Sequence, residues 1–134
     1  MEIKNTKRLN RLVAISVAII STFLAISKVK DDNIVQAMMQ AKSDSVDTWN
    51  EYQAKKIKNH VAKNSLPMYQ ALMALMADKP SHSRPAFSVL EKQLGELSTD
   101  IDRYSKEELV LKDKAKAFEK TYDDLNLKDD EFDL

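Results

Sequence analysis

The sequence is poor in the residues that make turns and cross-links. It contains no cysteine, one glycine and three prolines among its 134 residues. So few turn-forming residues exclude a β-sandwich, a β-barrel and a doubly wound sheet. The absence of cysteine excludes disulfide frameworks, thiolate zinc sites and thiol catalysis. The sequence therefore predicts an all-α chain, forming one small domain with an anchor.

Charged residues are plentiful but balanced, because 21 lysines and arginines oppose 21 aspartates and glutamates. A net charge of zero gives no general attraction to nucleic acid, and we predict no nucleic-acid partner. The two histidines, His60 and His82, lack metal-ligand spacing, and the chain has no glycine-rich phosphate loop and no nucleophile elbow. We therefore expect no enzymatic activity, no metal and no cofactor.

One long uncharged segment stands near the start of the chain. Residues 12–27 read LVAISVAIISTFLAIS, with basic residues on both sides. This pattern predicts a transmembrane anchor over residues 1–28, which is short for a bilayer core of about 20 apolar residues but extended by snorkelling flanks. A signal peptide cleaved after Ser27 and a buried core helix are the alternatives.

The basic residues beside this segment predict its orientation. Four precede it, and three follow within twenty residues: Lys4, Lys7, Arg8 and Arg11 before it, and Lys28, Lys30 and Lys42 after it. Because the more basic flank stays in the cytoplasm, we expect a single-pass protein of the bacterial inner membrane with a cytoplasmic N-terminus. The bulk of the chain would then be periplasmic or extracytoplasmic, with membrane lipid as one partner.

Small residues recur along one face of the predicted anchor, at steps of four, three and four. They are Ala14, Ala18, Ser21 and Ala25. Small residues let transmembrane helices approach closely, although alanine and serine are also common in spans without such a role. A single span can use this face only against another chain. We therefore expect a homo-oligomer or a subunit of a larger membrane complex.

The segment that follows predicts a long helix, because no glycine or proline occurs between residues 2 and 65. We expect this helix to run to about residue 64, with a weak apolar stripe interrupted by Ser45 and Lys56. The stripe consists of Ile34, Met38, Ala41, Trp49, Tyr52, Ile57 and Val61. Pro67 then favours the start of a short apolar helix over residues 66–77. A proline-bounded loop over residues 78–85 follows.

Three methionines of the short apolar helix admit two interpretations. Met68, Met73 and Met76 belong either to a buried cap or to a soft contact surface for a lipid, a small molecule or a protein.

The second half of the chain has the strongest periodicity. Apolar residues alternate at steps of three and four over about five heptads, which predicts a return helix over residues 86–126. The members of this series are Phe87, Leu90, Leu94, Leu97, Ile101, Tyr104, Glu108, Leu111, Ala115, Phe118, Tyr122 and Leu125. Such a narrow stripe needs a partner helix, and the nearest is the outer half of the first helix.

We therefore predict an antiparallel helical hairpin or coiled coil over residues 29–126, with Trp49 and Tyr52 in the seam. The sequence leaves open whether the stripe pairs within one chain or between two. An acidic tail over residues 127–134 is expected to be solvated.

The segment from Trp49 to Lys58, WNEYQAKKIK, resembles the bacterial domain of unknown function 4337 family. The resemblance covers the span, this motif, the proline-bounded connection and the long charged helix. It implies a small inner-membrane protein without assigned activity. Relatives usually continue into further C-terminal membrane helices, whereas this sequence stops at Leu134.

The motif also holds three lysines, Lys55, Lys56 and Lys58, with two interpretations. Either the aromatic residues pack in the hairpin and the lysines are solvated or paired, or this surface docks a partner protein. The whole sequence favours a non-catalytic, membrane-anchored scaffold or accessory subunit. A spanin-like envelope or lysis protein of a phage, and a lipid or small-molecule binder using the Met-rich segment, are the alternatives.

Overall fold

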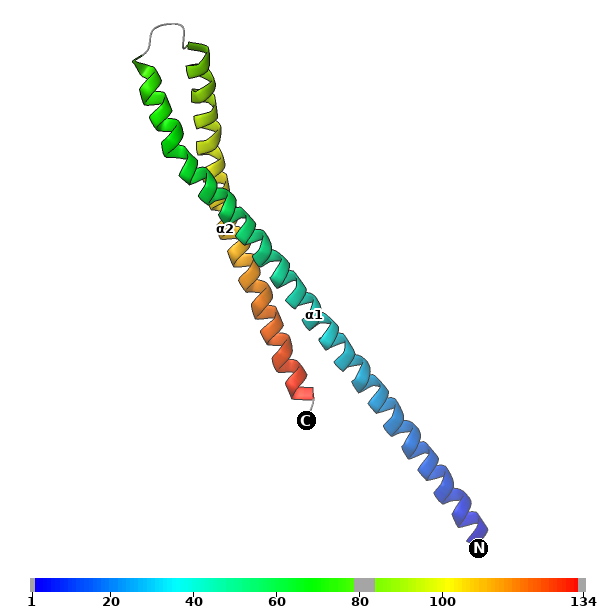
Figure 1. Cartoon of the computed structure of the whole chain (residues 1–134). Coiled ribbons are helices and arrows are strands. Elements are labelled where there is room, and N and C mark those ends of the chain that lie inside the picture. The colour runs from blue at the N-terminus through cyan, green and yellow to red at the C-terminus, as the bar shows by residue number, and fades with distance from the viewer. Residues whose placement is uncertain (1, 79–83, 133–134) are drawn as a thin grey trace. The chain divides into compact units, whose positions relative to one another are not determined.

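The computed structural model consists of two long α-helices. It describes residues 2–78 and 84–132, with the side chains of 5–78 and 84–131. Helix α1 spans Glu2–Ala77 and helix α2 spans Arg84–Phe132 (Figure 1). These described ranges contain no strand. The predictions of an all-α fold and of a helical hairpin are therefore confirmed.

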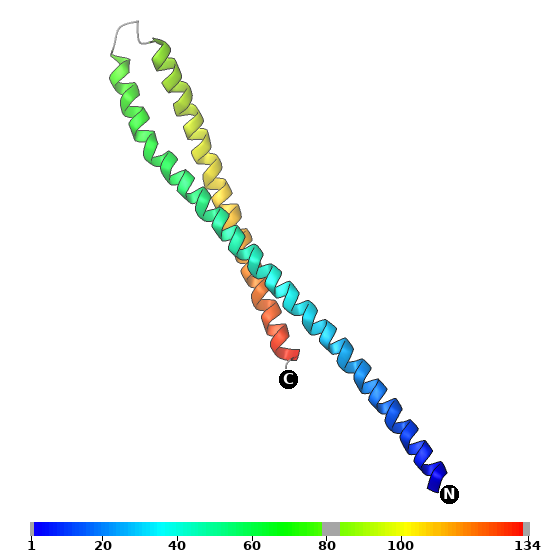
Figure 2. The same cartoon turned by 45° about the vertical axis from the view of Figure 1, so that its right-hand side comes forward.

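The chain divides into two compact units. The second unit, residues 42–119, contains the end of the hairpin at which the two helices are joined, and there they run in opposite directions (Figures 1 and 2). Contacts from Trp49 to Glu119 and from Lys55 to Glu107 define this antiparallel register. The first unit joins residues 1–41 to residues 120–134. Within it Ala41 is buried, and Ile34 and Tyr122 are half-buried.

Helix α1 continues without interruption through Pro67, so the predicted end near residue 64 and restart at residue 66 are corrected. An interior proline costs roughly 3 kcal/mol, because it cannot donate a hydrogen bond to the preceding turn. Packing against α2 opposes this cost on both sides of the proline. Ala62 is buried and Leu66 is half-buried before it, and Tyr69 is half-buried after it.

Helix α2 extends beyond the predicted range of 86–126 at both ends. The segment 127–132, expected as a solvated tail, continues the helix because it contains no glycine or proline, and Asp129 within it is half-buried. Residues 133–134 lie outside the described residues. So do residues 79–83, which make up most of the predicted loop 78–85.

The interior of the hairpin is a narrow row of small side chains. No large side chain of the described residues is fully buried. The buried residues are Ala41, Ser45, Thr48, Asn59, Ala62 and Ala115. Small side chains let two helices approach closely, so the contact depends on shape more than on apolar area.

The apolar stripe expected on α1 is therefore partly wrong. Ile57 and Val61 were expected on this stripe but are 64% and 60% exposed. The face toward α2 instead follows Ser45, Thr48, Tyr52, Lys55, Asn59 and Ala62, all buried or half-buried. This row keeps alternating steps of three and four, and continues through Leu66, Tyr69, Met73 and Met76. The spacing set by α2, rather than local hydrophobicity, determines which residues are covered.

Ala115→Leu should destabilise the hairpin by about 1–3 kcal/mol, because Ala115 is fully buried and its site has no room for a larger side chain. Thermal unfolding of the full chain in detergent, followed by circular dichroism, measures this effect. Ala117→Leu is the matched control, since Ala117 lies two residues away on an exposed position. Equal melting temperatures for the two variants would contradict the close approach of the helices.

Candidate functional site

A buried amide lies at the centre of the second unit. Asn59 is 4% exposed, and its Nδ2 donates hydrogen bonds to Glu108 Oε1 at 2.7 Å and to Ser105 Oγ at 3.2 Å. Its Oδ1 is buried, and no described residue donates a hydrogen bond to it. Because a polar group buried without its partners is costly, this amide favours the one helix alignment that brings Glu108 and Ser105 to it.

An ion pair lies one turn of α1 away from this amide. Lys55 Nζ pairs with Glu107 Oε2, and Arg103 Nε lies 3.9 Å from Glu107 Oε1. The hydrogen bond from Lys55 lowers the pKa of Glu107 below its ordinary value of 4.5, and the charges of Lys55, Arg103 and Lys58 lower it further. Glu107 is therefore ionised at neutral pH and holds cations from both helices.

Aromatic rings complete the contact between the helices. Trp49 Nε1 donates a hydrogen bond to Glu119 Oε1 at 2.7 Å, and the Trp49 and Tyr52 rings meet edge to face at 5.4 Å. Lys55 of α1 and Arg103 of α2 both lie over the Tyr104 ring, at 5.4 and 5.1 Å from its centroid. The segment singled out in the sequence, from Trp49 to Lys58, thus forms polar contacts with α2 through Trp49 and Lys55, and Asn59 directly after it adds two more.

These contacts align the two helices, and the charged side chains among them form ion pairs with each other. A shallow cleft is lined by Glu51, Lys55, Lys106, Glu107, Val110 and Leu111. Within it Lys55 pairs with Glu107, and Lys106 pairs with Asp102 at 2.8 Å. The described side chains include no group of three histidine, aspartate or glutamate residues placed to hold a metal ion.

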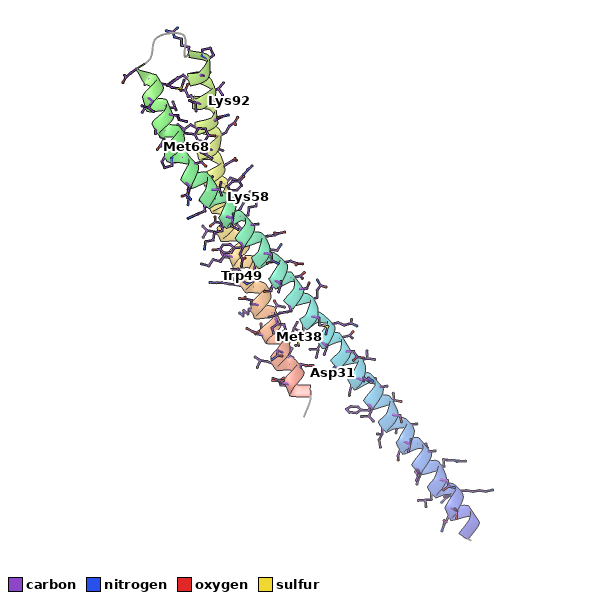
Figure 3. All side chains as sticks on the ribbon, viewed as in Figure 1. Asp31, Met38, Trp49, Lys58, Met68 and Lys92 are labelled. Atoms are coloured by element: carbon purple, nitrogen blue, oxygen red, sulfur yellow. The ribbon has the colours of Figure 1, made fainter. Side chains whose placement is uncertain are left out.

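The structure separates the residues predicted to form a partner surface. Lys55 is half-buried in the ion pair with Glu107, whereas Lys56 and Lys58 are exposed. Met73 and Met76 are half-buried on the row that faces α2. Met68, which is labelled in Figure 3, is not on that row and is 57% exposed. These residues therefore do not form one surface.

The residues predicted to form the seam are all partly covered, with Tyr52 on the row of α1 that faces α2 and Trp49 beside that row. All ten are half-buried: Trp49, Tyr52, Leu90, Leu94, Leu97, Ile101, Tyr104, Leu111, Phe118 and Tyr122. Sequence reasoning missed Asn59, Ser105 and Glu107, because single polar residues are not a hydrophobic signal. Alternating steps of four and three residues from Thr48 and Tyr52 lead to Asn59 and then to Ala62. This spacing was the signal that could have placed Asn59 on the face toward α2.

The start of α1 has a different character. An 18-residue window there has a mean hydropathy of 2.2 and none of it is buried, so this helix is long and apolar enough to cross a membrane. The small residues Ala14, Ala18, Ser21 and Ala25 are all exposed. Thr22 Oγ1 donates a hydrogen bond to the Ala18 carbonyl oxygen at 2.8 Å, which satisfies its hydroxyl within the helix.

A family model described as a domain of unknown function, DUF4337, matches residues 9–134. The chain belongs to the DUF4337 family. No curated protein and no solved structure matches it. The DUF4337 match covers the apolar start of α1 together with both helices of the hairpin, in agreement with the resemblance found at Trp49 to Lys58.

Ionised Glu107 should stabilise the folded chain near neutral pH and lose this effect in acid. Because its pKa is lowered in the folded chain, its contribution is present above pH 4.5 and is lost as the pH falls through the folded value. The wild type should therefore lose more stability on acidification than Glu107→Gln. Urea unfolding near neutrality and well below pH 4.5 measures the difference, with the exposed Glu91→Gln as control. An identical acid response for all three chains would contradict the ion pair.

Asn59→Asp should lower the free energy of unfolding by about 3 kcal/mol at neutral pH, because it replaces the donor to Glu108 with a second carboxylate. Part of this loss should be recovered in acid, where one of the two carboxylates is protonated. Asn33→Asp, at an exposed position, should change stability little. Equal effects of the two substitutions on urea unfolding would show that the Asn59 contacts do not matter.

Proposed function

We propose that this protein is a membrane-anchored helical scaffold or accessory subunit that acts without catalysis. The observation that supports this most directly is the apolar window at the start of α1, none of which is buried. Removing one large apolar side chain from water is worth about 1.5–3 kcal/mol, so a fully exposed apolar helix is costly in water. Lipid removes this cost without any protein partner.

The location that we propose is the bacterial inner membrane. Four basic residues before the apolar segment against three after it favour a cytoplasmic N-terminus and an extracytoplasmic hairpin. Helix α1 continues without interruption from the apolar segment into the hairpin, which supports a direct helical link between the two. The chemistry of the hairpin agrees with a structural role, because its polar groups pair between the two helices.

A homo-oligomer or a larger membrane complex follows from the same reasoning. The small face of the anchor offers a close-packing surface in lipid, where helix association depends on shape. Lipid or small-molecule binding by the Met-rich segment has less support, because Met73 and Met76 are half-buried toward α2.

The anchor and its orientation can be tested with single cysteines, because the chain contains none. The full chain should stay in the membrane pellet after alkaline carbonate extraction. In spheroplasts, an impermeant maleimide should label Ser98→Cys in the hairpin but not Asn5→Cys before the anchor. Both sites should react after detergent is added, which is the control. A chain recovered from the aqueous fraction with Lys28 as its first residue would overturn the proposal, and the opposite labelling would reverse the orientation.

A further inference from the structure

A second row of residues runs along α1 in the second unit, and it carries no charge. We call it the outer row: Ser43, Val46, Asn50, Gln53, Ile57, Val61, Asn64, Met68, Ala71 and Leu75. All ten residues are exposed. In a chain of which 31% of residues are charged, ten successive positions of one helix face without a charge form a distinct surface.

The outer row lies opposite the contact with α2. Ile57 is two residues from both Lys55 and Asn59, which places it about 200° around the helix from each of them. Successive members of the row are three or four residues apart, with one extra step of four between Ile57 and Val61. This is the spacing of a coiled-coil seam with one stutter. Helix α1 therefore carries two seams, and α2 covers only one of them.

The exposed apolar side chains of the outer row are most prominent near the C-terminal end of α1. Residues 64–77 contain no charged residue. The side toward α2 is half-buried at Leu66 and Tyr69, whereas Met68 is 57% and Leu75 is 69% exposed. A helix that is apolar on both sides is normally covered on both sides, and exposed apolar surface of this kind marks an interaction site.

We propose that the outer row is covered by the outer row of a second copy of this chain, with the two α1 helices parallel and in register. This inference rests on the proposed function, because two copies anchored in one membrane at the same end are held parallel. Equal residues then lie at equal heights, and each apolar residue of the row meets its own counterpart. The absence of charge removes the like-charge repulsion that an in-register pair of identical helices otherwise has.

Two asparagines in the row favour a second copy over lipid or an unrelated chain. In register, Asn50 meets Asn50 and Asn64 meets Asn64, and each amide both donates and accepts a hydrogen bond across the pair. An asparagine inside a coiled-coil seam fixes register and partner number at some cost in stability. Against lipid these amides have no such partners.

Cysteine cross-linking in native membranes tests the pairing directly, because the chain has no cysteine of its own. With a short cross-linker, Val46→Cys and Leu75→Cys should each form a homodimer. The two variants co-expressed should not link to each other, because 29 residues of helix separate these positions by about 44 Å. Val89→Cys, on α2 and 56% exposed, is the matched control and should stay monomeric.

Self-association in detergent provides a second measurement. Val61→Glu should weaken dimer formation at least tenfold by sedimentation, because it places two carboxylates against each other in the row. Val89→Glu, the same substitution at similar exposure, should leave the dimer unchanged. Unchanged helicity of both variants by circular dichroism is expected, because neither residue faces the other helix of the hairpin.

The outcomes separate this inference from the proposed function. A chain that stays in the membrane but forms no homodimer through the outer row, or links only to another protein, overturns the inference and leaves the anchor intact. Linking between Val46→Cys and Leu75→Cys indicates an antiparallel pair and also overturns it. A chain found in the aqueous fraction overturns the anchor, and cross-linking there still decides whether the outer row pairs with itself.

Discussion

The structure depends on the close approach of α1 and α2 along a row of small and polar side chains. Ala115 is fully buried, and Ser45, Thr48, Asn59 and Ala62 are the buried residues of α1 in the second unit. Two isolated helices cannot surround a large side chain, so bulky residues in the seam remain partly exposed. Specific contacts must therefore supply what a broad apolar core supplies in a globular protein.

Those contacts determine alignment more than they add stability. A pair such as Lys55 with Glu107 adds little stability, because its side chains are 32% and 37% exposed, solvent screens the charges, and ordering two long side chains costs entropy. A slip of one heptad along α2, however, would bring Asn59 beside Ile101 or Ala115 instead of Glu108 and remove its hydrogen bonds. The polar seam thus penalises the misaligned hairpins that a purely apolar stripe would tolerate.

This division explains which parts of the fold could be predicted from the sequence. The stripe of α2 was visible because its members, from Phe87 to Leu125, are mostly large and apolar. The matching row of α1 was not, because Ser45, Thr48 and Asn59 carry it, while Ile57 and Val61 lie out of step. Local propensity predicted a helix break at Pro67, but α1 continues through it. Packing against α2 stabilises the helix there, and such packing cannot be predicted from the local sequence. The polar contacts of Asn59 depend on the alignment of both helices, which no single segment encodes.

The two faces of α1 differ in the polar and charged groups that they offer to a partner helix. If both faces were apolar, the α2 of one copy and the α1 of another would compete for the same surface. The row of α1 that faces α2 instead offers the Asn59 amide and the Lys55 ammonium group, which Glu108 and Glu107 of α2 satisfy. The outer row offers only uncharged side chains, so Glu107 would lose the counter-charge of Lys55 there. In the proposed dimer, an outer row placed where α2 lies would leave the half-buried Lys55 without a carboxylate, and such a loss discriminates more strongly than apolar area does.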